Sequence, residues 1–310
     1  MVEVLYYAIP FFLLLLIVEA LSYRHLTDDH GLVGYEATDT RTSLTMGIGN
    51  VVINVVWKLV VVATYAALYE LTPLRIPPEA LWAWPLLFFA DDLAYYWFHR
   101  VSHESRLFWA SHVVHHSSQH YNLSTALRQT WVPMTYFPFW LPLPLLGFPP
   151  WMVLLAQSWS LIYQFWLHTE RIQKLPRWFE RTFNTPSHHR VHHGSNQRYL
   201  DKNYGGILIV WDRLFGTWEP ETERVRYGLT KQLRSFKPLH VAFHEYQALW
   251  QDLRAARGFT TRAQVLLRGP GWQPPQEEPR GRRAFGPGAL GVASVAEPAA
   301  EPPPPSPSSS

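Results

Sequence analysis

The stretch that decides the fold runs from Val2 to Ser22 and reads VEVLYYAIPFFLLLLIVEALS. An α-helix rises about 1.5 Å per residue, so a hydrocarbon core about 30 Å thick needs about 20 apolar residues. This stretch has that length and predicts a membrane-spanning helix. A cleaved signal peptide is the alternative, but such peptides begin with basic residues, and here Glu3 precedes the apolar core.

A second apolar run extends from Leu44 to Leu68 and is interrupted by Asn50, Asn54 and Lys58. Residues four apart share one face of a helix, so these three polar side chains are expected to point the same way. In membrane helices such side chains usually form hydrogen bonds between helices. We favour that structural role over substrate binding.

Two more apolar regions follow. The run from Ala80 to Phe98 carries Asp91 and Asp92, and ionisable groups at that depth are costly and usually functional. The region from Trp131 to His168 is broken by six prolines, which predicts two segments that turn back at residues 147–150. We therefore predict an all-α integral membrane bundle of about four to five transmembrane or re-entrant helices.

Composition and charge narrow the class of protein. Charged residues make up 16% of the 310 and aromatic residues 15%, a balance typical of chains solvated partly by lipid. The absence of cysteine excludes disulfide scaffolds and zinc–thiolate fingers. A net charge of +3 without a basic stripe argues against nucleic acid as a partner.

Topology and domain limits follow from the basic residues and from the C-terminal composition. Arg100, Arg106 and Arg128 flank the polar region next to the hairpin, so the positive-inside rule predicts that this region is cytoplasmic and that the chain is a multi-pass membrane protein. Residues 1–268 are expected to form one catalytic domain. Residues 269–310 are rich in Pro, Gly and Ser and predict a disordered tail.

Three histidine clusters lie in the predicted cytoplasmic region. They read HRVSH at 99–103, HVVHH at 112–116 and HRVHH at 189–193. On an α-helix, spacings of three and four place side chains about 5–6 Å apart, within reach of one metal ion or a neighbouring pair. We therefore expect a metal site in a helical cap on the cytoplasmic side of the bundle.

The number of histidines bears on the number of metals. A structural zinc needs four ligands and a catalytic zinc three, so eight imidazoles suggest two ions. Imidazole binds Zn, Cu, Fe and Ni alike, so the ligand type alone does not identify the metal.

The clusters lie within longer motifs that carry a resemblance. These are YYWFHRVSHE at 95–104, FWASHVVHHSS at 108–118, YNLSTALRQ at 121–129, NTPSHHRVHHG at 184–194, DKNYGG at 201–206 and WDRLFGT at 211–217. In these residues the chain resembles the fatty acid hydroxylase superfamily, the sterol desaturase-like membrane di-iron oxidases, and in particular its alkylglycerol monooxygenase branch.

The resemblance implies an enzyme that uses dioxygen to hydroxylate or desaturate an alkyl chain or a sterol-like lipid. It implies two iron ions, held by the eight box histidines, with two further candidate ligands. The metal ligands expected from it are His99, His103, His112, His115, His116, His168, His188, His189, His192 and His193.

The electrons must come from outside the chain, because it has neither a Rossmann glycine fingerprint nor a CxxC motif. We therefore expect an external reductant, either a tetrahydropterin or a separate electron-transfer protein. The remaining alternatives are a membrane zinc hydrolase and a histidine-rich metal-binding or transport protein.

Two carboxylates are candidate catalytic residues. Asp92 lies seven residues before His99, close to two helical turns, and could orient an imidazole by accepting its second N–H; a simple buried acceptor is the alternative. Glu104 follows His103 and is a candidate for handling protons, with a surface ion pair as the alternative. Arg128 and Asn122 are candidates for binding a lipid head group.

Overall fold

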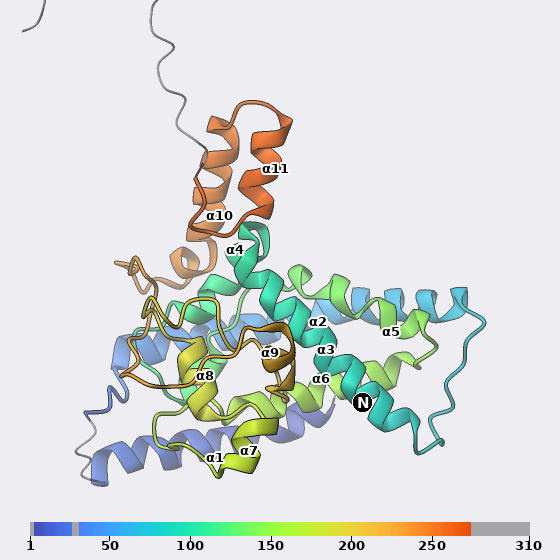
Figure 1. Cartoon of the computed structure of the whole chain (residues 1–310), viewed down its shortest axis with the longest axis horizontal. Coiled ribbons are helices and arrows are strands. Elements are labelled where there is room, and N and C mark those ends of the chain that lie inside the picture. The colour runs from blue at the N-terminus through green and yellow to red at the C-terminus, as the bar shows by residue number, and fades with distance from the viewer. Residues whose placement is uncertain (1–2, 27–30, 274–310) are drawn as a thin grey trace, which may run out of the picture. The chain divides into compact units, whose positions relative to one another are not determined.

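The computed structural model describes residues 3–26 and 31–273, and every regular element in this part of the chain is a helix (Figure 1). The α-helices are α1 (Glu3–His25), α2 (Ala37–Leu71), α3 (Ala83–Glu104), α4 (Arg106–His116), α5 (Pro142–Leu145), α6 (Pro150–Phe165), α7 (Arg177–Thr182), α8 (Pro186–His192), α9 (Val210–Phe215), α10 (Pro238–Ala255) and α11 (Phe259–Leu267). The 3₁₀ segments are η1 (Leu123–Leu127), η2 (Pro133–Thr135) and η3 (Phe137–Trp140). The predicted all-α class is confirmed; one isolated bridge joins Phe183 to Leu208.

Two of the described helices are long and apolar enough to cross a membrane. These are Tyr7–His25 in α1 and Ala37–Leu71 in α2, and only 11% of the apolar window in each is buried inside the protein. Apolar side chains that face outward along a whole helix are expected where lipid replaces water. The α3 helix begins at Ala83 and continues past the predicted apolar run to Glu104, so it carries the first histidine pair at its C-terminal end.

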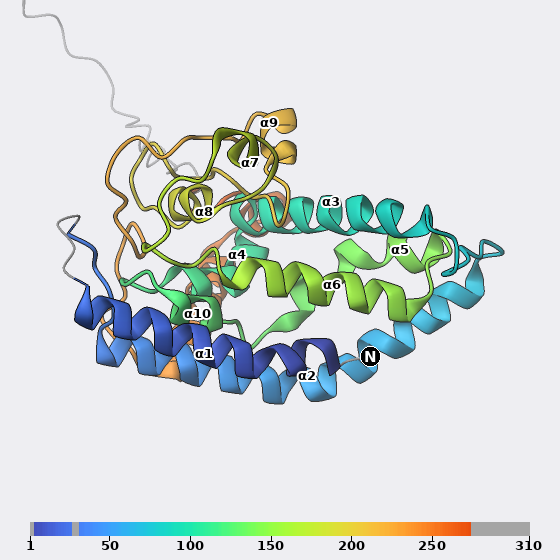
Figure 2. The same ribbon diagram turned by 90° about the horizontal axis from the view of Figure 1, so that it is seen from below.

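Four helices form the body of the fold. The α6 helix contacts each of the other three, α1, α2 and α3, and Figure 2 shows the C-terminal ends of α1, α3 and α6 and the N-terminal end of α2 toward one end. In the second apolar run, Asn50 bonds outside its own helix, since it donates to the Thr130 carbonyl oxygen at 2.6 Å, but Thr130 lies in the loop between η1 and η2 and not in another helix as predicted. Asn54 instead donates within its own helix, to the Asn50 carbonyl oxygen.

The proline-rich region turns back where the sequence predicts, but its first limb is not one helix. Prolines lack a backbone N–H, so this limb is divided into the short segments η2, η3 and α5. The turn is at Gly147, whose φ of +92° is a conformation that favours glycine. The Gly147 carbonyl oxygen accepts from the Ile76 amide, which fixes the turn to the α2–α3 connection.

Residues after the histidine clusters add a separate helical pair. The helices α10 and α11 pack against α4 through a small core that contains Ala110, Leu249 and Val265. Trp272 packs against the same core, so the first residues of the predicted tail belong to the folded unit. The rest of that tail, residues 274–310, lies outside the described residues.

Candidate metal site

The short helix α8 shows how local sequence aims the third histidine cluster. Thr185 precedes the helix and its hydroxyl accepts from the His188 amide, while Pro186 occupies the first helical turn, where no N–H is needed. The helix is buried along its whole length, and it presents histidines 189 and 192 to the ends of α3, α4 and α6.

Nine histidines form two compact groups. Within each group the ligand nitrogens all lie within 4.8 Å of one another. The first histidine group consists of His99, His103, His112, His116 and His192. The second histidine group consists of His115, His168, His189 and His193.

The two HxxHH clusters are shared between the groups. The outer pair of the second cluster, His112 and His116, belongs to the first group, while His115 between them belongs to the second. Residues four apart on a helix differ in direction by about 40°, whereas adjacent residues differ by about 100°. The same rule separates His192, which joins the first group, from its neighbour His193.

The spacing of the imidazole nitrogens fits metal ligands. In the first group the His112 Nε2 atom lies 3.0 Å from His99 Nε2 and 3.1 Å from His116 Nε2. In the second, the His168 Nε2 atom lies 3.1 Å from His115 Nε2 and 3.0 Å from His189 Nε2. Two nitrogens bound at right angles to an ion at about 2.1 Å would stand about 3 Å apart.

Backbone carbonyl oxygens set the orientation of several rings. The Nδ1 atoms of His99, His168 and His192 lie 2.8, 2.9 and 3.0 Å from the carbonyl oxygens of Tyr204, Gln164 and Lys202. A carbonyl can only accept, so each Nδ1 carries the proton and each Nε2 presents a lone pair to its group.

Burial keeps these rings in the form that binds metals. The pKa of His168 is lowered to about 4 and that of His189 well below its ordinary value, in both cases chiefly by desolvation. The neutral imidazole is therefore the stable form at neutral pH. The Nε2 atoms of His103 and His193 are buried and have no hydrogen-bond partner within the described chain, an arrangement that a bound ion would satisfy.

One predicted ligand lies outside both groups. The His188 Nε2 atom is 3.2 Å from a Glu180 carboxylate oxygen, and its Nδ1 atom is 3.3 Å from the Thr185 hydroxyl. Burial lowers the pKa of His188 to about 3. Its ring is occupied by these two partners, whereas His168, the other added candidate, belongs to the second group.

The two carboxylates expected near the metals have other partners. Asp92 is buried and accepts from the Ile207 and Leu208 amides and from the Trp211 ring N–H, at 2.7, 3.1 and 2.9 Å. It therefore holds the chain that follows residue 206 and does not orient an imidazole. Glu104 is exposed and accepts from Arg100 Nε at 2.9 Å, the surface ion pair that was the alternative.

The proposed head-group residues are also occupied. Arg128 is 1% exposed and pairs with Asp39 at 2.7 Å. Asn122 caps η1 and donates to the Gly34 carbonyl oxygen. Both residues hold the fold together, and neither offers free donors to a lipid.

One buried carboxylate near the second group was missed from the sequence. Glu19 of α1 accepts from the Tyr35 hydroxyl, from the Leu123 amide and from Thr169, the residue after His168. It ties the first apolar helix to the loop that carries a ligand. The signal was present in the sequence, because an acidic residue within an apolar run is costly unless it has partners.

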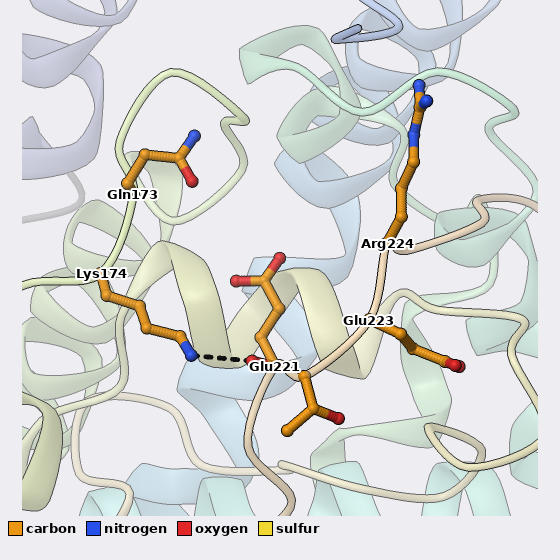
Figure 3. Close-up of a pocket in the computed structure, with 6 residues that line it drawn as sticks. Gln173, Lys174, Glu221, Glu223 and Arg224 are labelled. Atoms are coloured by element: carbon orange, nitrogen blue, oxygen red, sulfur yellow. Dashed lines mark hydrogen bonds between the residues drawn. The ribbon is translucent and has the colours of Figure 1, made fainter. Parts of the chain in front are cut away.

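A surface hollow of about 510 Å³ lies outside this site. It is lined by Gln173, Lys174, Glu221, Thr222, Glu223 and Arg224, and Lys174 donates to the Glu221 carbonyl oxygen across it (Figure 3). None of its lining residues belongs to either histidine group.

Comparison with known proteins agrees with this site. Residues 84–217, which hold both histidine groups, match the family model described as fatty acid hydroxylase. Over 269 residues the chain is 40% identical to the alkylglycerol monooxygenase of Homo sapiens and 41% identical to that of Danio rerio, covering 86% of this chain and 59% of each relative. The alkylglycerol monooxygenase of Xenopus tropicalis is 42% identical over 238 residues, 76% of this chain and 53% of its own length.

This chain thus spans little more than half the length of these curated relatives. No solved structure matches it.

Proposed function

We propose that this chain belongs to the fatty acid hydroxylase family, whose model matches residues 84–217, and that it is a membrane-bound di-iron monooxygenase that hydroxylates a lipid alkyl chain. The named relatives are alkylglycerol monooxygenases, so we propose a glycerol ether lipid as the substrate class. Dioxygen is the second substrate, and an external donor, a tetrahydropterin or a separate electron-transfer protein, supplies the electrons.

One observation carries the proposal: two separate groups of imidazoles adjoin, with the ring centroids of His116 and His193 only 4.4 Å apart. Two such groups suit two ions better than one, and a site of nitrogen ligands without thiolates suits iron used with dioxygen. Two irons bound there would supply the chemistry that activates dioxygen toward an unreactive C–H bond.

The protein residues have three tasks in this proposal. The carbonyl oxygens of Lys202, Tyr204 and Gln164 keep the ligand rings turned with Nε2 inward. The surrounding helices exclude water, since eight of the nine grouped histidines are buried. His112 is the partly exposed member, and its side of the first group is the side from which we expect the alkyl chain to approach.

Aromatic side chains cover that side. The Phe98 ring centroid lies 6.4 Å from that of His112 and 5.8 Å from that of Phe139. Such rings offer an alkyl chain an apolar surface next to the metals. The α1 and α2 helices are candidate membrane spans, so a lipid would reach this surface from the bilayer. The positive-inside pattern supports the proposal that the metal end lies on the cytoplasmic side.

The test is oxidation by the purified full chain. We expect two irons per chain and, with a reductant, dioxygen and an alkylglycerol, a product 16 mass units heavier. A product lighter by two mass units would replace hydroxylation with desaturation. Two zinc ions per chain, with no dioxygen consumption under reducing conditions, would contradict the proposal and favour a membrane zinc hydrolase.

A further inference from the structure

The loop at residues 201–206 supplies two of the carbonyl oxygens that hold the first histidine group. The Lys202 carbonyl oxygen faces His192 and the Tyr204 carbonyl oxygen faces His99. The loop turns sharply to do this, since Asp201 and Asn203 have φ values of 58° and 57°. Asp and Asn are the residue types that adopt such values most readily after glycine, because their short polar side chains can form local hydrogen bonds.

A buried carboxylate from α9 holds the end of this loop. One Asp212 carboxylate oxygen accepts from the Tyr204 amide and the other from the Gly205 amide, both at 2.7 Å. The Thr217 hydroxyl donates to the first of these oxygens at 2.7 Å. Asp212 is 0% exposed, so no water competes for these bonds.

Glycine at position 205 allows the backbone of the loop to lie close to the Asp212 carboxylate. A Cβ atom there would stand 2.5 Å from the Leu208 carbonyl oxygen and 3.0 Å from an Asp212 carboxylate oxygen. Only a residue without a side chain lets the backbone come this close to the carboxylate.

The bond to Gly205 acts directly on His99. The Gly205 N–H and the Tyr204 carbonyl belong to one peptide unit, which is planar, so the two groups point in opposite directions. Asp212 accepts on one side of this peptide and His99 donates on the other. Fixing the N–H therefore fixes the direction of the carbonyl oxygen that sets the ring.

We propose that Asp212 is a positioning residue of the first histidine group, acting through the Tyr204–Gly205 peptide to hold the His99 ring ready for a metal. The inference rests on the proposed function only in requiring that this group binds a divalent metal ion. The second histidine group has no bond to the 201–206 loop among the contacts that orient its rings.

Asp212→Asn tests this proposal at almost constant shape. The amide keeps one acceptor but turns an NH₂ group toward a backbone N–H, so at least one of the two amide bonds is lost. Mutation of a residue that orients a metal ligand typically lowers the affinity for the metal by about 10–100-fold. We expect the metal affinity of the first histidine group to fall by that factor, while the metal affinity of the second histidine group stays unchanged.

The measurement is the number of cobalt(II) or iron(II) ions bound per folded chain, by titration of the full chain in detergent. Asp252→Asn is the matched control, because this carboxylate pairs with Arg106 and does not contact the loop. We expect about one tightly bound ion in the Asp212 variant and two in the control and the wild type. Two ions bound with wild-type affinity in the Asp212 variant would overturn the inference.

A second variant covers the case in which Asp212→Asn does not fold. Thr217→Val keeps the carboxylate and removes one hydroxyl that donates to it. We expect a smaller loss of affinity, again only in the first group, and unchanged affinity would overturn the inference. A wild-type chain that binds two metals without oxidising lipid would contradict the proposed function alone, since the metal count remains readable.

Discussion

Neutral imidazoles held about 3 Å apart are the central residue-scale feature of this protein. Each ring that gives its Nδ1 proton to a carbonyl oxygen directs a lone pair inward, and the rings are too deeply buried to gain a proton instead. Lone pairs that face one another repel unless a cation lies between them. The arrangement therefore favours metal binding, and without a metal ion it does not stabilise the folded chain.

Adjacent residues of α8 allow a matched test. We expect His189→Ala to reduce metal content from two ions to about one per chain and to lower oxidation by more than about 100-fold, because the second group loses a ligand. His188→Ala is the control, since His188 pairs with Glu180 and belongs to neither group. Metal analysis and dioxygen consumption measure both. Equal metal loss in the two variants would contradict the assignment of His189, and not His188, as a metal ligand.

The buried pair of Arg128 and Asp39 allows a stability test. Removing one partner of a buried ion pair leaves an unpaired charge and costs about 3–5 kcal/mol. We expect Asp39→Ala to destabilise the chain by that amount, as measured by unfolding in detergent. The double variant with Arg128→Met should recover part of the loss. Additive losses would show that the two side chains do not interact.

At the scale of elements, the site depends on where helices end. The α3 and α4 helices are separated by Ser105 alone, whose extended backbone turns the chain so that both histidine-bearing ends face the same space. The α6 helix ends at Phe165, three residues before His168. Helix ends bring ligands from distant parts of the sequence together more readily than helix middles, because the chain can change direction there.

The turn at Gly147 gives an element-scale prediction. A left-handed backbone costs a residue with a side chain about 1–2 kcal/mol, and a Cβ atom here would also stand 2.8 Å from the Leu74 backbone carbonyl carbon. We expect Gly147→Ala to lower the thermal midpoint clearly more than Gly216→Ala. Gly216 has a φ of 75° but open space around it, so it carries the backbone cost alone. Equal decreases of the thermal midpoint in the two variants would mean that the backbone around Leu74 moves away from the new Cβ atom at little cost in free energy.

At the scale of the whole molecule, the helical body has two distinct ends. One is formed by the C-terminal ends of α3 and α6, which lead into the histidine groups, and the other by the α2–α3 connection (Figure 2), where the Ile76 amide donates to the Gly147 carbonyl oxygen. If α1 and α2 cross the bilayer, as their length and apolar surface permit, these ends lie on opposite sides. Under the proposed function, a lipid substrate would then reach the site from the bilayer and a reductant from the aqueous side.

The absence of cysteine makes this topology testable by labelling. Glu79→Cys lies in the α2–α3 connection, and Lys231→Cys lies in the segment before α10; both positions are exposed. In sealed vesicles, an impermeant maleimide should modify the two positions from opposite sides, with position 231 reacting from the cytoplasmic side. Permeabilised vesicles should label both variants. Reaction of both from the same side would refute the proposed orientation.

Local sequence determined the helical class, the two apolar helices, the turn near Gly147 and the candidate ligands, because helical periodicity and apolar length are properties of short segments. Tertiary structure decided how the ligands divide: His115 and His192 leave their own clusters for opposite groups, and His188 joins neither. That division depends on the direction in which separate helices meet. The same holds for Asp92, whose partners lie more than a hundred residues away and could not be read from its spacing to His99.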